Sequence, residues 1–166
     1  TMLQVVGFET TSLITVIGSA GVAAGLAMQG SLSNFAGGSL ILIMKPFKVG
    51  DYIIEDGHKN EGTVKTIGLV YTSLLTPDNK LIMIPNGNLA NNSMTNVTAQ
   101  EKRRLDITVG ISYNADLKQA KELMMEIMKA HPAVLKEEEM VSFVSSLDDS
   151  AVIMGCRCWV PTSDYW

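Results

Sequence analysis

The longest pattern in the chain is an apolar stretch from Thr10 to Met44 that contains no charged residue. Glu9 precedes it and Lys45 ends it. A charge-free apolar run of this length is typical of a membrane-spanning helix. A straight helix of this length would measure roughly 50 Å, whereas the hydrocarbon core of a bilayer is about 30 Å thick. We therefore expect the helix to bend, and Gly30 is the expected place because several poor helix formers follow it.

Small residues fall on two opposite sides of this helix when successive residues are placed about 100° apart. Glycines form one stripe and alanines the other: Gly18, Gly21 and Gly25 on the first, Ala20, Ala23 and Ala27 on the second. In lipid, close backbone approach at small residues is a main source of helix association. Two unlike stripes predict a contact between the glycine side of one copy and the alanine side of the next. Repeated around an axis, such a contact closes a ring.

A third face of the helix would line the centre of that ring. It carries Thr15, Ser19, Val22, Leu26 and Gln29. Val22 and Leu26 are its only large apolar side chains, and a narrow apolar ring can gate a pore by dewetting. The small residues fit equally well in a helix that is simply packed inside a membrane bundle. The positions of these residues around the helix therefore fit both a pore-lining helix and a helix packed inside a bundle.

The pattern after Pro46 changes to short strands separated by turn residues, which predicts a small β barrel. Its first strand is expected from Val49, and Asn88 is expected to cap a short helix. From residue 103 onward the pattern changes again and predicts one strand, then one helix and then two strands. Asp116 is expected to cap that helix. The order β-α-β-β predicts an α+β, ferredoxin-like half-domain.

Charge is distributed very unevenly along the 166 residues, whose formal net charge is −4. All 13 Lys and Arg, and every acidic residue except Glu9, lie from Lys45 onward. This soluble part is mildly acidic, which argues against nucleic acid as its partner. Lys45 and Lys48 directly follow the apolar run, and positive charge at a membrane end favours the cytoplasmic side. No signal-peptide pattern precedes the run, and the chain stops where a new element begins, so we expect a fragment of a longer protein.

Candidate chemistry is sparse, and the sequence predicts neither an enzyme nor a cofactor or metal site. No phosphate-binding loop, Ser/His/Asp set or cluster of metal ligands is found. Cys156 and Cys158 share one face of a strand and are expected to be buried thiols in a reduced cytosol. His58 is expected to be a solvated loop residue. Asp148 and Asp149 are explained by a turn.

Several segments together resemble the small-conductance mechanosensitive channels, the MscS-like family. The resemblance covers nearly the whole chain and is strongest in residues 23–34, Gly38, Pro46-Phe47, Gly50-Asp51, Gly62-Thr63-Val64 and Ile84-Pro85-Asn86-Gly87. It implies a homoheptamer in the cell (inner) membrane, with a pore that membrane tension opens during osmotic stress. Its partners would be further copies of itself, membrane lipids, and permeating ions and osmolytes, with no nucleic acid.

The resemblance also implies a division of the chain. Residues 1–45 would be the bent, pore-lining transmembrane helix, residues 46–98 an Sm-like β barrel, and residues 99–166 an incomplete ferredoxin-like vestibule domain. Gly30 and Gly38 match two glycines at which the family's pore helix bends. Val22 and Leu26 occupy the positions of two leucine rings that narrow the family's pore, with valine a smaller, still apolar departure.

Two other classes of function remain compatible with the residues. One is a non-conducting, membrane-anchored oligomeric scaffold whose cytoplasmic domain binds a partner. The other is an RNA-binding module, because Sm-like barrels can bind RNA. The acidic balance and the absence of a basic, aromatic surface weaken the second alternative.

Overall fold

The computed structural model describes residues 10–166 and contains two compact units. Val97 is the last residue of the first unit, and Thr98 is the first residue of the second. The first nine residues of the expected 1–45 domain lie outside the described residues. The element order is that of the predicted fold class, a long apolar helix, a small β barrel and an α+β domain.

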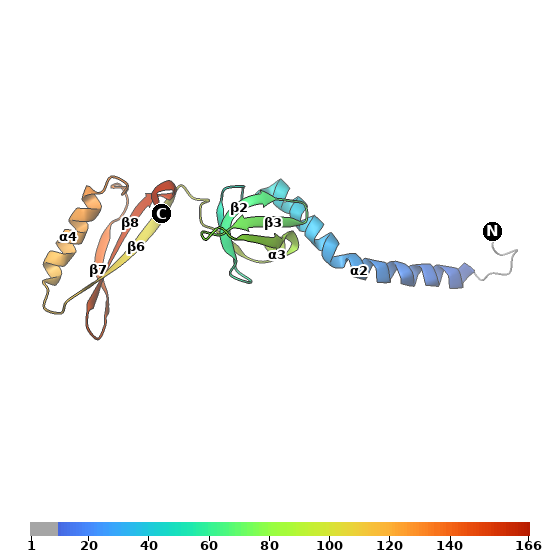
Figure 1. Cartoon of the computed structure of the whole chain (residues 1–166), viewed down its shortest axis with the longest axis horizontal. Helices are drawn as coiled ribbons and strands as arrows, with labels where there is room; N and C mark the ends of the chain where they lie inside the picture. The colour runs from blue at the N-terminus through green and yellow to red at the C-terminus, as the bar shows by residue number, and fades with distance from the viewer. Residues whose placement is uncertain (1–9) are drawn as a thin grey trace. The chain divides into compact units, whose positions relative to one another are not determined.

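Helix α2 (Thr10–Met44) dominates the first unit and continues without a break through Gly30. Figure 1 shows that its first part projects away from the strands, that its course changes direction, and that its last turns lie against them. The helix ends because Lys45 takes a left-handed conformation, with φ of 48°, and Pro46 follows. The amide of Lys45 still donates to the carbonyl of Ile41 at 2.9 Å.

The barrel of the first unit is a five-stranded antiparallel sheet in the order β4-β3-β2-β1-β5. Its strands are β1 (Tyr52–Glu55), β2 (Glu61–Ile67), β3 (Tyr71–Leu75), β4 (Leu81–Pro85) and β5 (Met94–Asn96). A short helix, α3 (Asn86–Asn91), connects β4 to β5. Neighbours in this sheet are mostly neighbours in sequence, so most strands join through short turns.

The barrel core takes one residue from α2. Ile41 is 3% exposed and packs in the same cluster as Phe47, Ile53 and Leu74, all of which are buried. Burial of an isoleucine side chain is worth about 1.5–3 kcal/mol. The last part of α2 is therefore a structural part of the barrel.

Two local predictions for the barrel are wrong. The strand expected from Val49 begins at Tyr52, because Gly50 has φ of 97° and Asp51 donates its amide to the carbonyl of Lys48 at 3.1 Å, closing a turn. Asn88 is not a helix cap, since α3 already begins at Asn86. Strand β5 was not predicted, because three residues are too few to show an alternating pattern.

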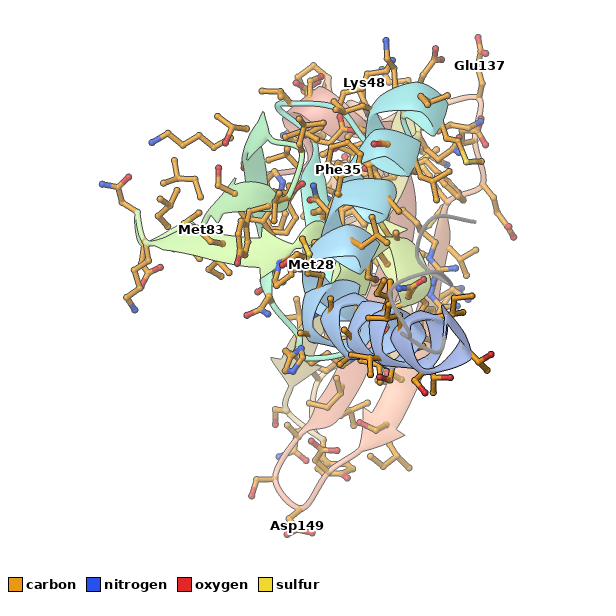
Figure 2. The ribbon with its side chains drawn as sticks, turned by 90° about the vertical axis from the view of Figure 1, so that its right-hand side faces the viewer. Met28, Phe35, Lys48, Met83, Glu137 and Asp149 are labelled. Carbon is orange, nitrogen blue, oxygen red and sulfur yellow. The ribbon has the colours of Figure 1, made fainter. Side chains whose placement is uncertain are left out.

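The second unit has the expected β-α-β-β order. It comprises β6 (Lys102–Ile111), α4 (Leu117–Ala130), β7 (Val141–Leu147), β8 (Val152–Pro161) and a short 3-10 turn, η1 (Thr162–Asp164). The strands form one antiparallel sheet in the order β6-β8-β7. Helix α4 packs on one face of this sheet over a core that includes Met128, Cys156 and Cys158. Figure 2 shows Asp149 at the tip of the hairpin that joins β7 to β8.

Both ends of α4 have a defined cap, and the one at its start is the one predicted. The carboxylate of Asp116 accepts hydrogen bonds from the amides of Lys118 at 2.8 Å and Gln119 at 3.1 Å, so the N-cap is confirmed. His131 is the C-cap, and Pro132 follows it. These caps place the amphipathic face of α4 over the sheet.

Candidate functional site

The first part of α2, from Thr11 to Leu32, has every described side chain exposed within a single chain. Its glycines are equally open. A Cβ atom built on Gly18, Gly21 or Gly25 would meet nothing within 4 Å. An apolar surface of this size is unusual for a protein in water, so a membrane or further protein must cover it.

The five residues of the predicted pore face lie along this exposed part of α2. Val22 is 65% exposed and Leu26 is 67% exposed, while Gln29 and the two hydroxyl residues are also exposed. A single chain spaces these residues along one helix and does not bring them together. Their convergence around a pore, and the constriction at Val22 and Leu26, remain predictions that need several copies of the chain.

The hydroxyl groups on this face are bonded to their own helix. Thr15 Oγ1 donates to the carbonyl of Thr11 at 2.9 Å, and Ser19 Oγ donates to the carbonyl of Val16 at 2.9 Å. Bonding of this kind satisfies a hydroxyl donor where water is scarce. Each oxygen keeps its lone pairs for other partners.

The last part of α2 contacts the barrel closely, and glycine makes the contact possible. Gly37 and Gly38 are buried. A Cβ atom on Gly38 would lie 2.0 Å from the carbonyl oxygen of Leu69, and one on Gly37 would lie 2.7 Å from that of Asn86. Neither approach is possible for a residue with a side chain unless the backbone moves.

Asn34 adds a hydrogen bond to the same contact. Its side-chain oxygen accepts from the backbone amide of Gly87, at the start of α3, at 2.9 Å. Helices α2 and α3 therefore meet through one polar bond and two glycines. In Figure 2, Met28 and Phe35 are labelled on the part of α2 that leads to this contact.

Asn86 holds the barrel side of this contact in place. The side chain is fully buried, and its oxygen accepts from Thr72 Oγ1 at 2.7 Å. Its Nδ2 donates to the carbonyl of Gly68 at 2.8 Å, and its backbone amide donates to that of Val70 at 2.9 Å. A buried amide with its partners satisfied fixes local geometry strongly, because leaving any partner unpaired is costly.

Asn34, Gly37 and Asn86 are contact residues that the sequence patterns did not predict. Two signals were available. Asn34 is a polar residue inside a charge-free run, and Asn86 lies in a segment that carried the family resemblance. Gly38 was predicted only as a bending point, a role that the close contact neither tests nor requires.

A buried carboxylate lies at the end of β1. Glu55 accepts hydrogen bonds from the backbone amides of Gly57 at 2.8 Å and His58 at 2.9 Å. Burial acts to raise the pKa of Glu55, but these amide donors, with His58 and Asn60 nearby, lower it overall. Glu55 therefore shapes the turn between β1 and β2, while the His58 side chain is exposed, as expected.

The two cysteines are free and buried, as expected. Burial raises the pKa of both Cys156 and Cys158, which keeps them as thiols. Within residues 10–166, no group of three or more His, Cys, Asp and Glu side chains is placed to hold a metal ion. The candidate site is therefore α2 itself, with its exposed first part and its barrel-bound last part.

Comparison with known families identifies both units. Residues 30–99 match the family described as "Mechanosensitive ion channel, beta-domain", and residues 105–166 match "Mechanosensitive ion channel MscS, C-terminal". The chain thus belongs to the MscS family of mechanosensitive ion channels, as the sequence resemblance had indicated.

Individual relatives agree with this assignment. An uncharacterized MscS family protein of Buchnera aphidicola (subsp. Baizongia pistaciae) is 38% identical over 99% of this chain and 59% of its own length. A small-conductance mechanosensitive channel of Edwardsiella ictaluri is 37% identical over 89% of this chain and 51% of its own length. The chain therefore spans little more than half of the curated relatives that it matches.

A solved structure has the same fold. The crystal structure of Helicobacter pylori MscS in a closed state matches with a TM-score of 0.87 and 30% identity, covering 98% of this chain and 63% of that one. Helix α2 is also long and apolar enough to cross a membrane between Thr11 and Met44.

Proposed function

We propose that this chain is the pore-lining and cytoplasmic part of an ion channel that membrane tension opens, releasing ions and small osmolytes during hypo-osmotic shock. The observation that carries the proposal is the exposed first part of α2, which has open glycines on one side and alanines on the other. Family membership supports the same function.

The proposed pore is a ring of α2 helices, one from each copy. Glycine stripes pack on the alanine stripes of the neighbour, and Thr15, Ser19 and Gln29 line the pore with the apolar pair between Ser19 and Gln29. At Val22 and Leu26 the pore is narrow and apolar, so water leaves it and ions cannot cross. The homoheptamer of the family is the proposed assembly.

The barrel supports self-association independently of the helix. Strands β4 and β5 are the two edges of the sheet, and an edge strand offers unpaired backbone groups to another chain. Met83 on β4 is 61% exposed, and Leu81 on the same strand is also exposed (Figure 2, where Met83 is labelled). Two unlike edges favour a head-to-tail contact between copies, the same type of contact as the unlike stripes of α2.

Opening is driven by membrane area. Tension favours whichever packing of the helix ring occupies more area in the bilayer, so the closed and open rings differ in stability by an amount that tension changes. A bend at Gly30 would let the first part of α2 tilt while the last part stays on the barrel. Lys45 and Lys48 directly follow α2, and positive charge at a membrane end favours the cytoplasmic side, so the two units that follow are proposed to lie in the cytoplasm.

Recording from membrane patches under suction tests the proposal. The full-length protein should give discrete currents that begin at a defined tension, whereas a non-conducting scaffold gives none. Cysteine pairs placed on the two stripes, such as Gly21→Cys with Ala23→Cys, should form cross-links between copies on oxidation. Folded protein that shows neither currents nor cross-links would falsify the ring.

A further inference from the structure

No charged residue lies on α2, so no ring of fixed charges is available to select ions along the proposed pore. Along α2, selection then depends on dipoles that face the proposed lumen. Thr15 and Ser19 supply the hydroxyl dipoles of the predicted pore face, on successive turns before Val22. Gln29 lies beyond the constriction and offers both a donor and an acceptor.

The hydroxyl protons point toward the helix and away from the lumen. Thr15 Oγ1 donates to the carbonyl of Thr11, and Ser19 Oγ donates to the carbonyl of Val16, each at 2.9 Å. A hydroxyl whose proton is held in this way presents only oxygen lone pairs to an ion. Such oxygens solvate a cation, as carbonyl oxygens do in cation filters, but they offer no donor to an anion.

We propose, on the basis of the channel function proposed above, that the Thr15 and Ser19 hydroxyl oxygens make the approach to the constriction favour cations over anions. The direction of both hydrogen bonds is unambiguous, because a carbonyl oxygen can only accept. Repetition in every copy turns each hydroxyl into a ring of acceptors.

The dipole of the helix acts in the opposite sense but is short-ranged. Its N-terminal end favours anions, and this effect fades within the first turn. Within the described residues α2 runs from Thr10, so Thr15 and Ser19 lie beyond its first described turn. The hydroxyl rings are therefore the nearest oriented dipoles to the Val22 side of the constriction.

The test measures the reversal potential of the full-length channel in patches of electrically neutral lipid under a KCl gradient. The wild type should prefer K⁺ to Cl⁻. Removing both hydroxyls with Thr15→Val and Ser19→Ala should lower the K⁺ to Cl⁻ permeability ratio by about twofold. Ser19→Thr keeps the oxygen and its proton acceptor, so it should keep the ratio.

Ser39→Ala is the matched control. Ser39 Oγ also donates to its own helix, at the carbonyl of Phe35 at 2.9 Å, but it lies in the barrel-bound part of α2. Its removal should leave the ratio unchanged. If the double variant does not conduct, Ser19→Ala alone should give a smaller fall in the same direction.

Two results would overturn the proposal while leaving the channel function intact. One is a wild type that prefers Cl⁻, and the other is a hydroxyl-free variant that conducts with the wild-type ratio. A wild-type protein without tension-activated current would instead overturn the channel function itself.

Discussion

The two parts of α2 belong to one helix but have opposite environments. From Thr11 to Leu32 every side chain is exposed, and a Cβ atom on Gly18, Gly21 or Gly25 would meet no neighbour. Further along, Gly38 is buried, and its backbone lies so close to Leu69 that a side chain cannot fit. Figure 1 shows the same contrast between a projecting part and a part that lies against the strands.

This contrast separates two uses of glycine. In the first part, glycine leaves a surface open for contacts that a single chain cannot make. In the last part, glycine permits a backbone contact inside the chain itself. Within one chain, the helix therefore links a part with an uncovered surface to a part that is packed on the barrel.

The largest expected effect is a change of function in the exposed part. Val22→Asp or Leu26→Ser should wet the proposed constriction, because every copy contributes the same polar side chain to the ring. Cells that express either variant should grow poorly, and patches should open at lower tension than wild type.

Met28→Ser is the control, since residues placed about 100° apart along the helix put Met28 on the side away from the pore face. It should affect packing without causing leak. Normal behaviour of the Val22 and Leu26 variants together with a leaking Met28 variant would show that the pore face is assigned wrongly.

Alanine substitution should distinguish the two groups of glycines by stability. Gly38→Ala forces a methyl group to within 2.0 Å of a backbone oxygen and should destabilise the first unit by about 2 kcal/mol or more. Gly25→Ala meets no atom within its own chain and should not reduce the stability of that chain. Thermal unfolding of the full chain in detergent measures both. Equal losses of stability in the two variants would show that the two parts of α2 do not differ in their packing within the chain. If Gly38→Ala instead changed gating without any loss of stability, the result would favour Gly38 as a bending point.

Loss of the polar bond between α2 and α3 should have a smaller effect. Asn34→Ala leaves the amide of Gly87 without its acceptor and should cost about 1–2 kcal/mol. Gln29→Ala, in the exposed part, should cost less than Asn34→Ala in the same unfolding measurement. In patches, Asn34→Ala should also weaken the link between the helix and the barrel and alter how long the channel stays open. Identical unfolding curves for both variants would argue against the bond as a stabilising contact.

The smallest effect per copy is expected at Gly30, between the two parts. Gly30→Ala should favour the helix by roughly 1 kcal/mol per copy, through backbone entropy alone. No neighbouring atom obstructs the added methyl group, so stability should not fall. If Gly30 is a working hinge, opening or inactivation should change in tension-clamped patches. Unaltered gating would locate the hinge elsewhere on α2.

Much of the architecture could be predicted from the sequence because periodicity and turn chemistry are local. The charge-free run predicted α2, the Asp116 cap predicted the start of α4, and the β-α-β-β order predicted the second unit. The family resemblance identified the class of protein because its motifs extend over both units. The start of β1 was misplaced because a positive φ at Gly50 depends on a turn that hydrophobic alternation does not reveal.

The sequence by itself determined that a membrane-compatible helix with two small-residue sides and one mixed face precedes a small β barrel and an α+β unit. Only the tertiary structure decided that this helix is divided between assembly and barrel. Ile41 could have faced lipid, and Gly38 could have been only a flexible joint. The role of Ile41 depends on where Leu74 lies in space, and that of Gly38 depends on where Leu69 and Asn86 lie, some thirty to fifty positions along the chain. Contacts between residues so far apart in sequence leave no periodic pattern, because they arise only when the end of the helix packs against the folded barrel.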